Sequence, residues 1–195
     1  MDLTTITPSL AGLKALSHPV RLKILGLLRS EGPATATTLA ATLGLNTGAT
    51  SYHLRQLAQH GFVVDDAARG NGRDRWWQAA HQATTTEAAA HPDRETRETL
   101  DAYLQSVAII HTEQLQGAIE ERSTLSDEWR AASTFSDWNL RLTPRRAHAL
   151  VEAIERVLTE TDEDEDGAAA EFVVQVSAFP RPGVLGAETA AKDES

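Results

Sequence analysis

The chain has 195 residues, enough for one medium-sized domain or two small ones with a buried core. It contains no cysteine, which excludes disulfides, thiolate metal sites and cysteine nucleophiles. No stretch approaches the ~18 consecutive apolar residues that span a bilayer, and the N-terminus lacks a signal-peptide pattern, so we expect a cytoplasmic protein without membrane contact.

The net charge of −10 is unevenly distributed along the sequence. Residues 1–80 carry 8 Lys/Arg and 5 Asp/Glu, whereas residues 81–195 carry 10 and 23. Residues 32–64 contain no acid at all. Charge has to be assigned to each domain separately. The first part of the chain is therefore mildly basic and compatible with a nucleic-acid partner, although the whole chain is acidic.

Two helices are predicted before residue 33. Leucines recur at helical spacing over residues 10–16, and Pro19 stands at a favourable first position for a second helix. The second helix is apolar on most sides between residues 20 and 28, which is typical of a central helix. The Gly-Pro pair at residues 32–33 ends it.

A helix-turn-helix pattern follows. Thr35 can cap a short helix, and Gly44 provides the turn after it. Asn46 can cap the next helix, which Gly61 ends. The inward face of this second helix is set by the spacing i, i+4, i+7 and consists of Thr50, Leu54 and Leu57.

The outward face of that second helix is the main functional candidate. It carries small, hydroxyl-bearing and basic side chains, the kind that a helix presents to bases and phosphates in a DNA major groove. Its members are Thr47, Gly48, Ser51, Tyr52, Arg55 and Gln59. Arg55 lies deeper along the helix, where a phosphate contact is favoured. The competing interpretation is a solvated helical surface. His53 lies beside the inward leucines and is interpreted as a half-buried structural residue.

Residues 62–68 and 73–80, on either side of a Gly-rich tip, predict two antiparallel strands. Arg69 and Arg73 flank that tip, and side chains at a hairpin tip can enter the minor groove or hold the backbone. Arg75 is expected to pair with a neighbouring aspartate instead. The adjacent tryptophans that follow are assigned to core packing rather than to base stacking.

Taken in order, "LKALSHPVRLKILGLL", "TTLAATLGL", "TSYHLRQLAQHGFV" and the Arg-rich hairpin resemble the winged helix-turn-helix of ArsR-type bacterial transcriptional regulators. The resemblance covers residues ~8–80. It implies double-stranded DNA as the partner, a homodimer, and a phosphate contact from Thr35 or Thr37 before the recognition helix. It also suggests metal sensing, but the thiolate motif of the family needs cysteines that this chain lacks.

No metal or other cofactor is expected. Asp101 and His111 would have to share a helical face to form the alternative metal site of the family. Ten residues correspond to roughly 1000° of helical rotation, so the two side chains flank a face rather than share it. His91 and Asp93 near the helix start offer no convergent partner.

A long helix is predicted from Pro92 to about residue 121, preceded by a connector at residues 81–91. It has two adjacent apolar stripes, and we expect one to cover the winged domain and the other to contact a second subunit. The residues assigned to the dimer interface are Leu100, Tyr103, Leu104, Val107, Ile110 and Gln114.

The fold class predicted is mainly α with a small β component. Its parts are a winged helix-turn-helix domain (residues 1–80), a connector and dimerisation helix (81–122), a small strand-helix-strand unit (123–180) and a mobile tail (181–195). The strands are expected near residues 135–142 and 172–179, on either side of a helix that starts at Pro144 and an acidic connector. Three aromatic residues could line a pocket in this unit or form its core, and core packing is preferred: Trp129, Phe135 and Trp138.

These features predict a homodimeric, sequence-specific DNA-binding regulator, a repressor whose operator affinity changes with a small-molecule or protein effector. The alternative is a winged-helix module that binds another protein through the acidic C-terminal half. No phosphate-binding loop, nucleophile motif or catalytic carboxylate pair is present in the sequence, so no catalytic residue is assigned.

Overall fold

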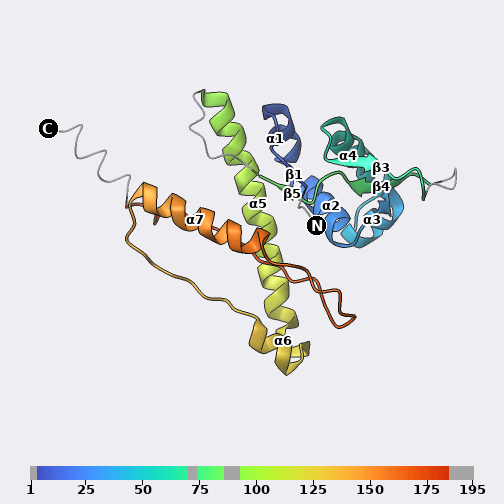
Figure 1. Cartoon of the computed structure of the whole chain (residues 1–195). Coiled ribbons are helices and arrows are strands. Elements are labelled where there is room, and N and C mark those ends of the chain that lie inside the picture. Colours follow the sequence, from blue (N-terminus) through green and yellow to red (C-terminus); the bar gives the residue numbers. More distant parts are fainter. Residues whose placement is uncertain (1–3, 70–73, 86–92, 185–195) are drawn as a thin grey trace. The chain divides into compact units, whose positions relative to one another are not determined.

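The computed structural model describes residues 4–69, 74–85 and 93–184 (Figure 1). The chain divides into two compact units, residues 1–134 and residues 135–195. The first unit contains the helix-turn-helix and the long helix that follows it. Residues 123–134, which were expected to begin the C-terminal unit, belong with the first one.

Six helices and a short 3-10 turn form most of the described part of the first unit. They are α1 (Leu10–Leu16), α2 (Pro19–Ser30), α3 (Ala36–Leu43), α4 (Thr47–Gln59), α5 (Arg94–Glu121), the turn Arg122–Thr124 and α6 (Asp127–Ala132). As the sequence predicts, Pro19 begins α2, and the side chains of Thr35 and Asn46 cap α3 and α4. Asp93 caps α5 by accepting from the Thr96 backbone N–H at 2.8 Å.

The wing is a three-stranded antiparallel sheet. Its strands are β2 (Ala34–Thr35), β4 (Trp76–Ala79) and β3 (Val63–Asp65), in the order β2-β4-β3. The register places Val63 opposite Ala79, and Thr35 opposite Trp76. The two hairpin strands were predicted from strand-forming residues on either side of a Gly-rich tip. The short β2 was not, because two residues are too few to show a period.

A second, two-stranded sheet joins the start of the chain to the segment after the wing. Here β1 (Thr5–Ile6) runs parallel to β5 (Ala83–Thr84). Arg29 at the end of α2 supports the same segment, since its guanidinium donates to the His81 carbonyl at 2.9 Å and to the Thr84 hydroxyl at 2.8 Å. The chain therefore enters and leaves the winged domain at neighbouring points.

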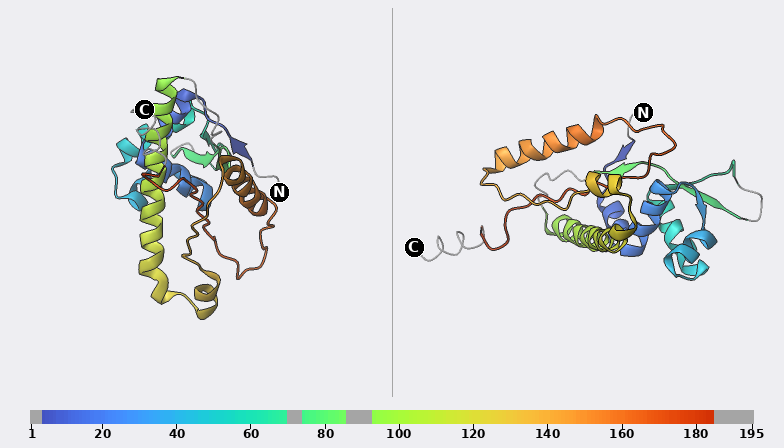
Figure 2. Two further views of the ribbon diagram at one scale, coloured as in Figure 1. Left: turned by 90° about the vertical axis from the view of Figure 1, so that its left-hand side faces the viewer. Right: turned by 90° about the horizontal axis from the view of Figure 1, so that it is seen from below.

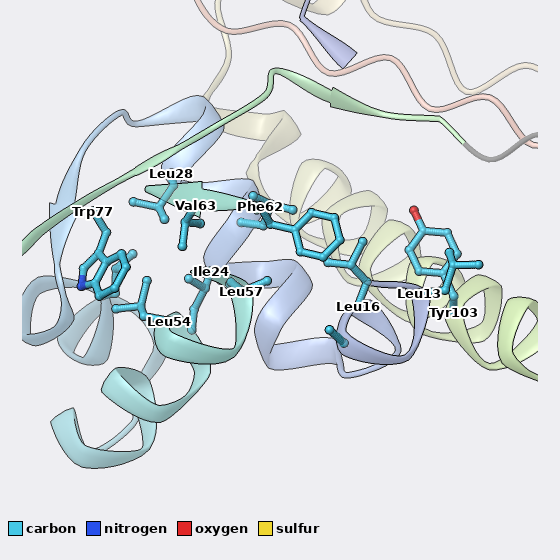
Figure 3. Packing of buried hydrophobic residues seen from close by; sticks show 13 residues of the cluster. Leu13, Leu16, Ile24, Leu28, Leu54, Leu57, Phe62, Val63, Trp77 and Tyr103 are labelled. Carbon is cyan, nitrogen blue, oxygen red and sulfur yellow. The ribbon is translucent and has the colours of Figure 1, made fainter. Parts of the chain in front are cut away.

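One hydrophobic core connects α1, α2, α4, the wing and α5 (Figure 3). Leu16, Ile24 and Leu54 are fully buried in it, and the Trp77 ring closes the wing end. The expectation that the tryptophan pair packs inward holds for Trp77, while Trp76 is half-buried. At the other end Tyr103 of α5 packs beside Leu13 and Leu16 of α1, so the long helix is part of the core.

The second unit differs from the prediction. The helix α7 (Pro144–Thr159) is found where expected, but the described residues 135–143 and 160–184 contain no strand. Alternating residues form a strand only when a neighbouring strand supplies the ladder hydrogen bonds, and this unit provides no ladder. The core role of its aromatic residues is also wrong, because Phe135 and Trp138 are 50% and 77% exposed. Trp129 is half-buried and belongs to α6 of the first unit.

The overall class is nevertheless the predicted one. The described chain is dominated by helices, and its small antiparallel sheet packs against the helix-turn-helix (Figure 2). These are the elements of a winged helix-turn-helix, in the order helix, helix, helix-turn-helix, wing.

Candidate nucleic-acid interface

The helix α4 is fixed by the buried side chains of its inner face and by the cap at its start. Thr50, Leu54 and Leu57 are completely buried, which confirms the predicted inward face. The Asn46 side chain accepts from the Ala49 backbone N–H at 2.8 Å. Gly44 adopts the left-handed conformation (φ 63°) that lets α3 turn into α4. The outward face of α4 is therefore presented in a fixed orientation.

The predicted outward residues do lie on the open side of α4. Thr47, Gly48, Arg55 and Gln59 are exposed, Ser51 is half-buried, and Tyr52 is 52% exposed. A Cβ at Gly48 would approach only the Asn46 carboxamide, at 3.3 Å, so the outer side of this position is open. A flat surface can approach the start of α4 closely, with hydroxyl and guanidinium groups beside it.

A hollow of about 190 Å³ opens beside α4. It brings together the start of α3, the middle of α4 and the wing. Its lining includes Thr35, Thr37, Ser51, Arg55, Asp74, Arg75 and Trp77. Hydroxyl groups and two guanidinium groups make the hollow suitable for a phosphate, with the Asp74 carboxylate as an opposing charge.

Arginines in the wing are partly engaged within the chain. The Arg75 Nε donates to Asp65 Oδ2 at 2.7 Å, and its guanidinium lies 4.1 Å from the Trp77 ring centroid. The expected partner of Arg75 was an aspartate, and it is Asp65 rather than Asp66 or Asp74. Arg69 is exposed at the wing, with its Nε 3.4 Å from Asp66. Arg73 lies outside the described residues.

A group of polar rings between α2 and α4 was not predicted as a unit. His18 caps α2, since its Nδ1 accepts from the Val20 backbone N–H at 3.2 Å, and its ring lies 4.7 Å from the ring of His53. Among the described side chains, His53 Nδ1 and Arg21 Nε are buried without a hydrogen-bond partner. Burial lowers the pKa of His53, and the neighbouring His18 and Arg21 lower it further.

The half-buried position of His53 agrees with the structural role expected for it. Arg21, in contrast, had no signal in the sequence, because a single arginine in an apolar helix is most simply interpreted as solvent-exposed. Burial lowers its pKa as well. The cluster therefore holds two nitrogen groups in poorly solvated positions directly behind the exposed Tyr52.

The two faces of α5 have different roles, and this corrects the dimer assignment. Tyr103 is 7% exposed, and Leu100 and Val107 pack against the core of their own chain. A side chain covered by its own domain is not free to contact a second subunit. Ile110 is half-buried, and Gln114 is exposed beside this inner stripe.

The outer face of α5 is formed by large apolar side chains that remain open to solvent. The outer face consists of Leu104, Ala108, Leu115 and Ile119, with Ile109 at its flank. These side chains are between 44% and 55% exposed, leaving aside the small Ala108. Of the residues assigned to the dimer interface, Leu104 is thus the one large apolar residue that lies on the outer face of α5.

Within the described ranges, no group of three or more histidine or acidic side chains is placed to hold a metal ion. None of the helices in that same part of the chain is both long and apolar enough to cross a bilayer.

These elements define a winged helix-turn-helix domain, and residues 16–65 match a family model described as a helix-turn-helix domain. Over 56 residues the chain is 46% identical to the HTH-type transcriptional regulator NmtR of Mycobacterium tuberculosis. That match covers 29% of this chain and 46% of NmtR, so the chain spans just under half the length of this curated relative. The resemblance of the first domain to ArsR-type winged helix-turn-helix regulators is thereby confirmed.

Two solved structures are similar over a larger share of the chain. One is an apo mutant of ZitR from Lactococcus lactis (15% identity, 73% of this chain and 83% of that one, TM-score 0.33). The other is RV1404 from Mycobacterium tuberculosis (12% identity, 78% and 84%, TM-score 0.30). At these TM-scores neither likeness supports a conclusion about the fold, which rests on the helices and strands of the chain itself.

Proposed function

We propose that the protein is a homodimeric transcriptional regulator that binds double-stranded DNA in a sequence-specific way. In this proposal it is a repressor, and an effector changes its operator affinity. The observation that carries the proposal is the outer face of α4. Exposed Tyr52 and Arg55 project from a helix whose opposite side is fixed by three fully buried residues. Such a helix can enter a major groove without losing order.

Each part of the interface has an assigned role in this proposal. Thr47, Gly48, Ser51 and Tyr52 approach base edges at the start of α4, and Gln59 lies at its far end. Arg55 shares the hollow with the hydroxyl groups of α3, so a phosphate there contacts Arg55 and Thr35 or Thr37. The wing approaches the neighbouring minor groove with Arg69 and Arg73.

The dimer is the second part of the proposal. A single domain of this size buries too little surface for tight, specific binding, so regulators of this kind occupy two half-sites. The outer face of α5 is an apolar surface on a 28-residue helix. A second copy of the chain covers it in our proposal, and the two α4 helices then meet successive major grooves.

The test is fluorescence-anisotropy titration of duplexes from the upstream region of the protein's own gene, against scrambled duplexes, at two salt concentrations. Wild type should bind the upstream duplexes selectively and more weakly at high salt. Tyr52→Ala should cost ~1–3 kcal/mol on the selected duplex. Tyr52→Phe keeps the ring and removes only the hydroxyl, so it separates hydrogen bonding from packing.

Arg55→Ala should weaken binding to all duplexes alike and lower the salt slope by about one ion. The matched control is Arg122→Ala, which removes the same charge from an exposed position at the end of α5. If Arg122→Ala weakens binding as much as Arg55→Ala, only net charge matters and the assignment of α4 is wrong. If wild type binds no duplex even at low salt, the protein-binding alternative replaces the proposal.

A further inference from the structure

The second unit leaves an amphipathic helix and its flanking segments uncovered. No residue between 135 and 184 is buried. On α7 the apolar side chains recur at helical spacing, yet Leu150, Val157 and Leu158 are 40%, 65% and 41% exposed. The flanking segments expose further large apolar residues, including Trp138 and Phe179. An apolar surface of this extent is typical of a protein–protein interface.

The charges at the two ends of α7 indicate which partner fits. Residues 138–151 contain three arginines and no acid, and residues 159–171 contain seven acids and no base. Within the described chain, none of the arginines 141, 145 and 146 forms an ion pair. The two ends of this 16-residue helix lie about 24 Å apart, too far for a direct ion pair between its first-turn arginines and Glu160 of the same helix.

We propose that α7 pairs with α7 of a second copy of the chain, in an antiparallel arrangement. The basic start of one helix then lies beside the acidic end of the other, and this happens twice because the contact is two-fold symmetric. A membrane or an acidic protein would meet the acidic end with repulsion. A basic protein would be repelled by the arginines at the start of α7. A second copy matches both ends.

The register follows from the apolar stripe and agrees with the charges. If Ala147 lies opposite Leu158, the two-fold axis passes between Glu152 and Ala153, and Arg146 lies within one residue of Glu160 on the second copy. At 100° per residue, Arg146 and Glu160 both stand at the same edge of the apolar stripe of α7. The same axis brings Val151 opposite Ile154, and both belong to the apolar stripe together with Ala147 and Leu158. One register thus satisfies the charged ends and the apolar centre together.

This interface is separate from the outer face of α5 and needs no DNA. It goes beyond the proposed function, because it assigns a role to the residues that extend past the dimerisation helix. Failure of DNA binding would leave the α7 pair untouched.

The absence of cysteine makes a clean test available, since any introduced cysteine is the sole thiol. In the full chain, two copies of Ile154→Cys would lie about 4.5 Å apart along the helix direction, within reach of a disulfide. Two copies of Leu158→Cys, or of Ala147→Cys, would lie about 16.5 Å apart. After mild oxidation without DNA, Ile154→Cys should give on the order of ten times more cross-linked dimer than either end variant.

Two combined variants complete the test. Ala147→Cys/Leu158→Cys should cross-link efficiently, because the thiol at position 147 of one copy then faces the thiol at position 158 of the other. In the Ile154→Cys background, Arg146→Glu and Glu160→Arg should each reduce cross-linking, and the two together should restore it. The inference is overturned if no variant cross-links, if all single cysteines cross-link equally, or if the charge swap does not restore the dimer. Equal cross-linking would indicate parallel or unspecific association.

Discussion

The imidazole rings of His18 and His53 lie against each other, with 4.7 Å between their centroids and 52° between their planes. His18 caps the start of the central helix α2, and His53 belongs to α4, so the contact joins the core helix to the proposed recognition helix. The Tyr52 ring meets the edge of His53 at 5.6 Å on the exposed side. The half-buried His53 ring thus lies between the start of α2 and the residue proposed to contact bases.

The free energy of unfolding should depend on pH through His53. Burial lowers the pKa of this imidazole below its ordinary 6.5, with His18 and Arg21 adding to the effect. The unfolded chain therefore takes up a proton at a higher pH than the folded one. Stability should be constant above the ordinary pKa and fall as the pH drops through it, until the folded-state pKa is reached.

Urea unfolding at about pH 7.5 and about pH 5.5 measures this dependence. His53→Gln should lose less stability on acidification than wild type. Burial also lowers the pKa of His111, so His111→Gln should remove part of the remaining slope. The exposed His148→Gln serves as the control. Identical slopes for His53→Gln and wild type would contradict the assignment.

Two glycines should respond to alanine with opposite signs. Gly44 has a φ of 63° in the turn between α3 and α4, so Gly44→Ala should destabilise the protein by ~1–2 kcal/mol. Gly26 lies inside α2 with open space where a Cβ would stand. Gly26→Ala should stabilise by ~0.5–1 kcal/mol. Urea midpoints compare the two, and a shift of the same sign in both would refute the local explanation.

Asn46 links the stability of α4 to DNA binding in a way that two variants can separate. Asn46→Ala removes the cap and should cost ~1 kcal/mol of unfolding free energy. Asn46→Asp keeps an oxygen for the Ala49 N–H and favours the helix dipole, so stability should be unchanged. Its added negative charge at the DNA-facing end should nevertheless weaken duplex binding. Anisotropy and urea unfolding of both variants check this, and Asn46→Asp with full DNA affinity would argue against contact at this end.

The outer face of α5 should control the oligomeric state. Leu115→Glu places a charge in the apolar surface that a second subunit would cover. In the Arg146→Glu background, where the proposed α7 pair is weakened, it should convert a dimer to monomer in sedimentation experiments. Operator affinity should fall with it, because half-site binding is then uncoupled. Gln116→Glu adds the same charge one residue further along the exposed helix. In the same background Gln116→Glu should leave the dimer intact, and a dimer that survives Leu115→Glu there would exclude this face as the contact.

Much of the winged domain was predictable because its signals are local. The caps Thr35 and Asn46, and the turn at Gly44, each follow from a single residue type at a helix end. The buried side of α4 followed from the spacing of Thr50, Leu54 and Leu57. The predicted outward face of α4 was then simply the remainder of the helix.

The unpredicted parts depend on contacts between distant residues. The wide apolar surface of α5 indicated two packing faces, but the sequence could not say that Tyr103 turns toward α1. The position of Arg21 beside His53 arises only when α2 and α4 pack together. In the second unit the alternation of residues 172–179 was real, but strand formation requires a neighbour that periodicity cannot identify.

The parallel pairing of Thr5 with Ala83 has a mechanical consequence. Any pull on the linker after residue 85 reaches the winged domain first at β5, where β1 and the guanidinium of Arg29 hold the chain. The wing strands β3 and β4 precede this held segment in the chain, so the force would act on β5 before it acts on them. The helix α5 contacts α1 and α2, and both of these contact α4. A movement of α5 would therefore reach α4 through these helix contacts rather than through the hairpin.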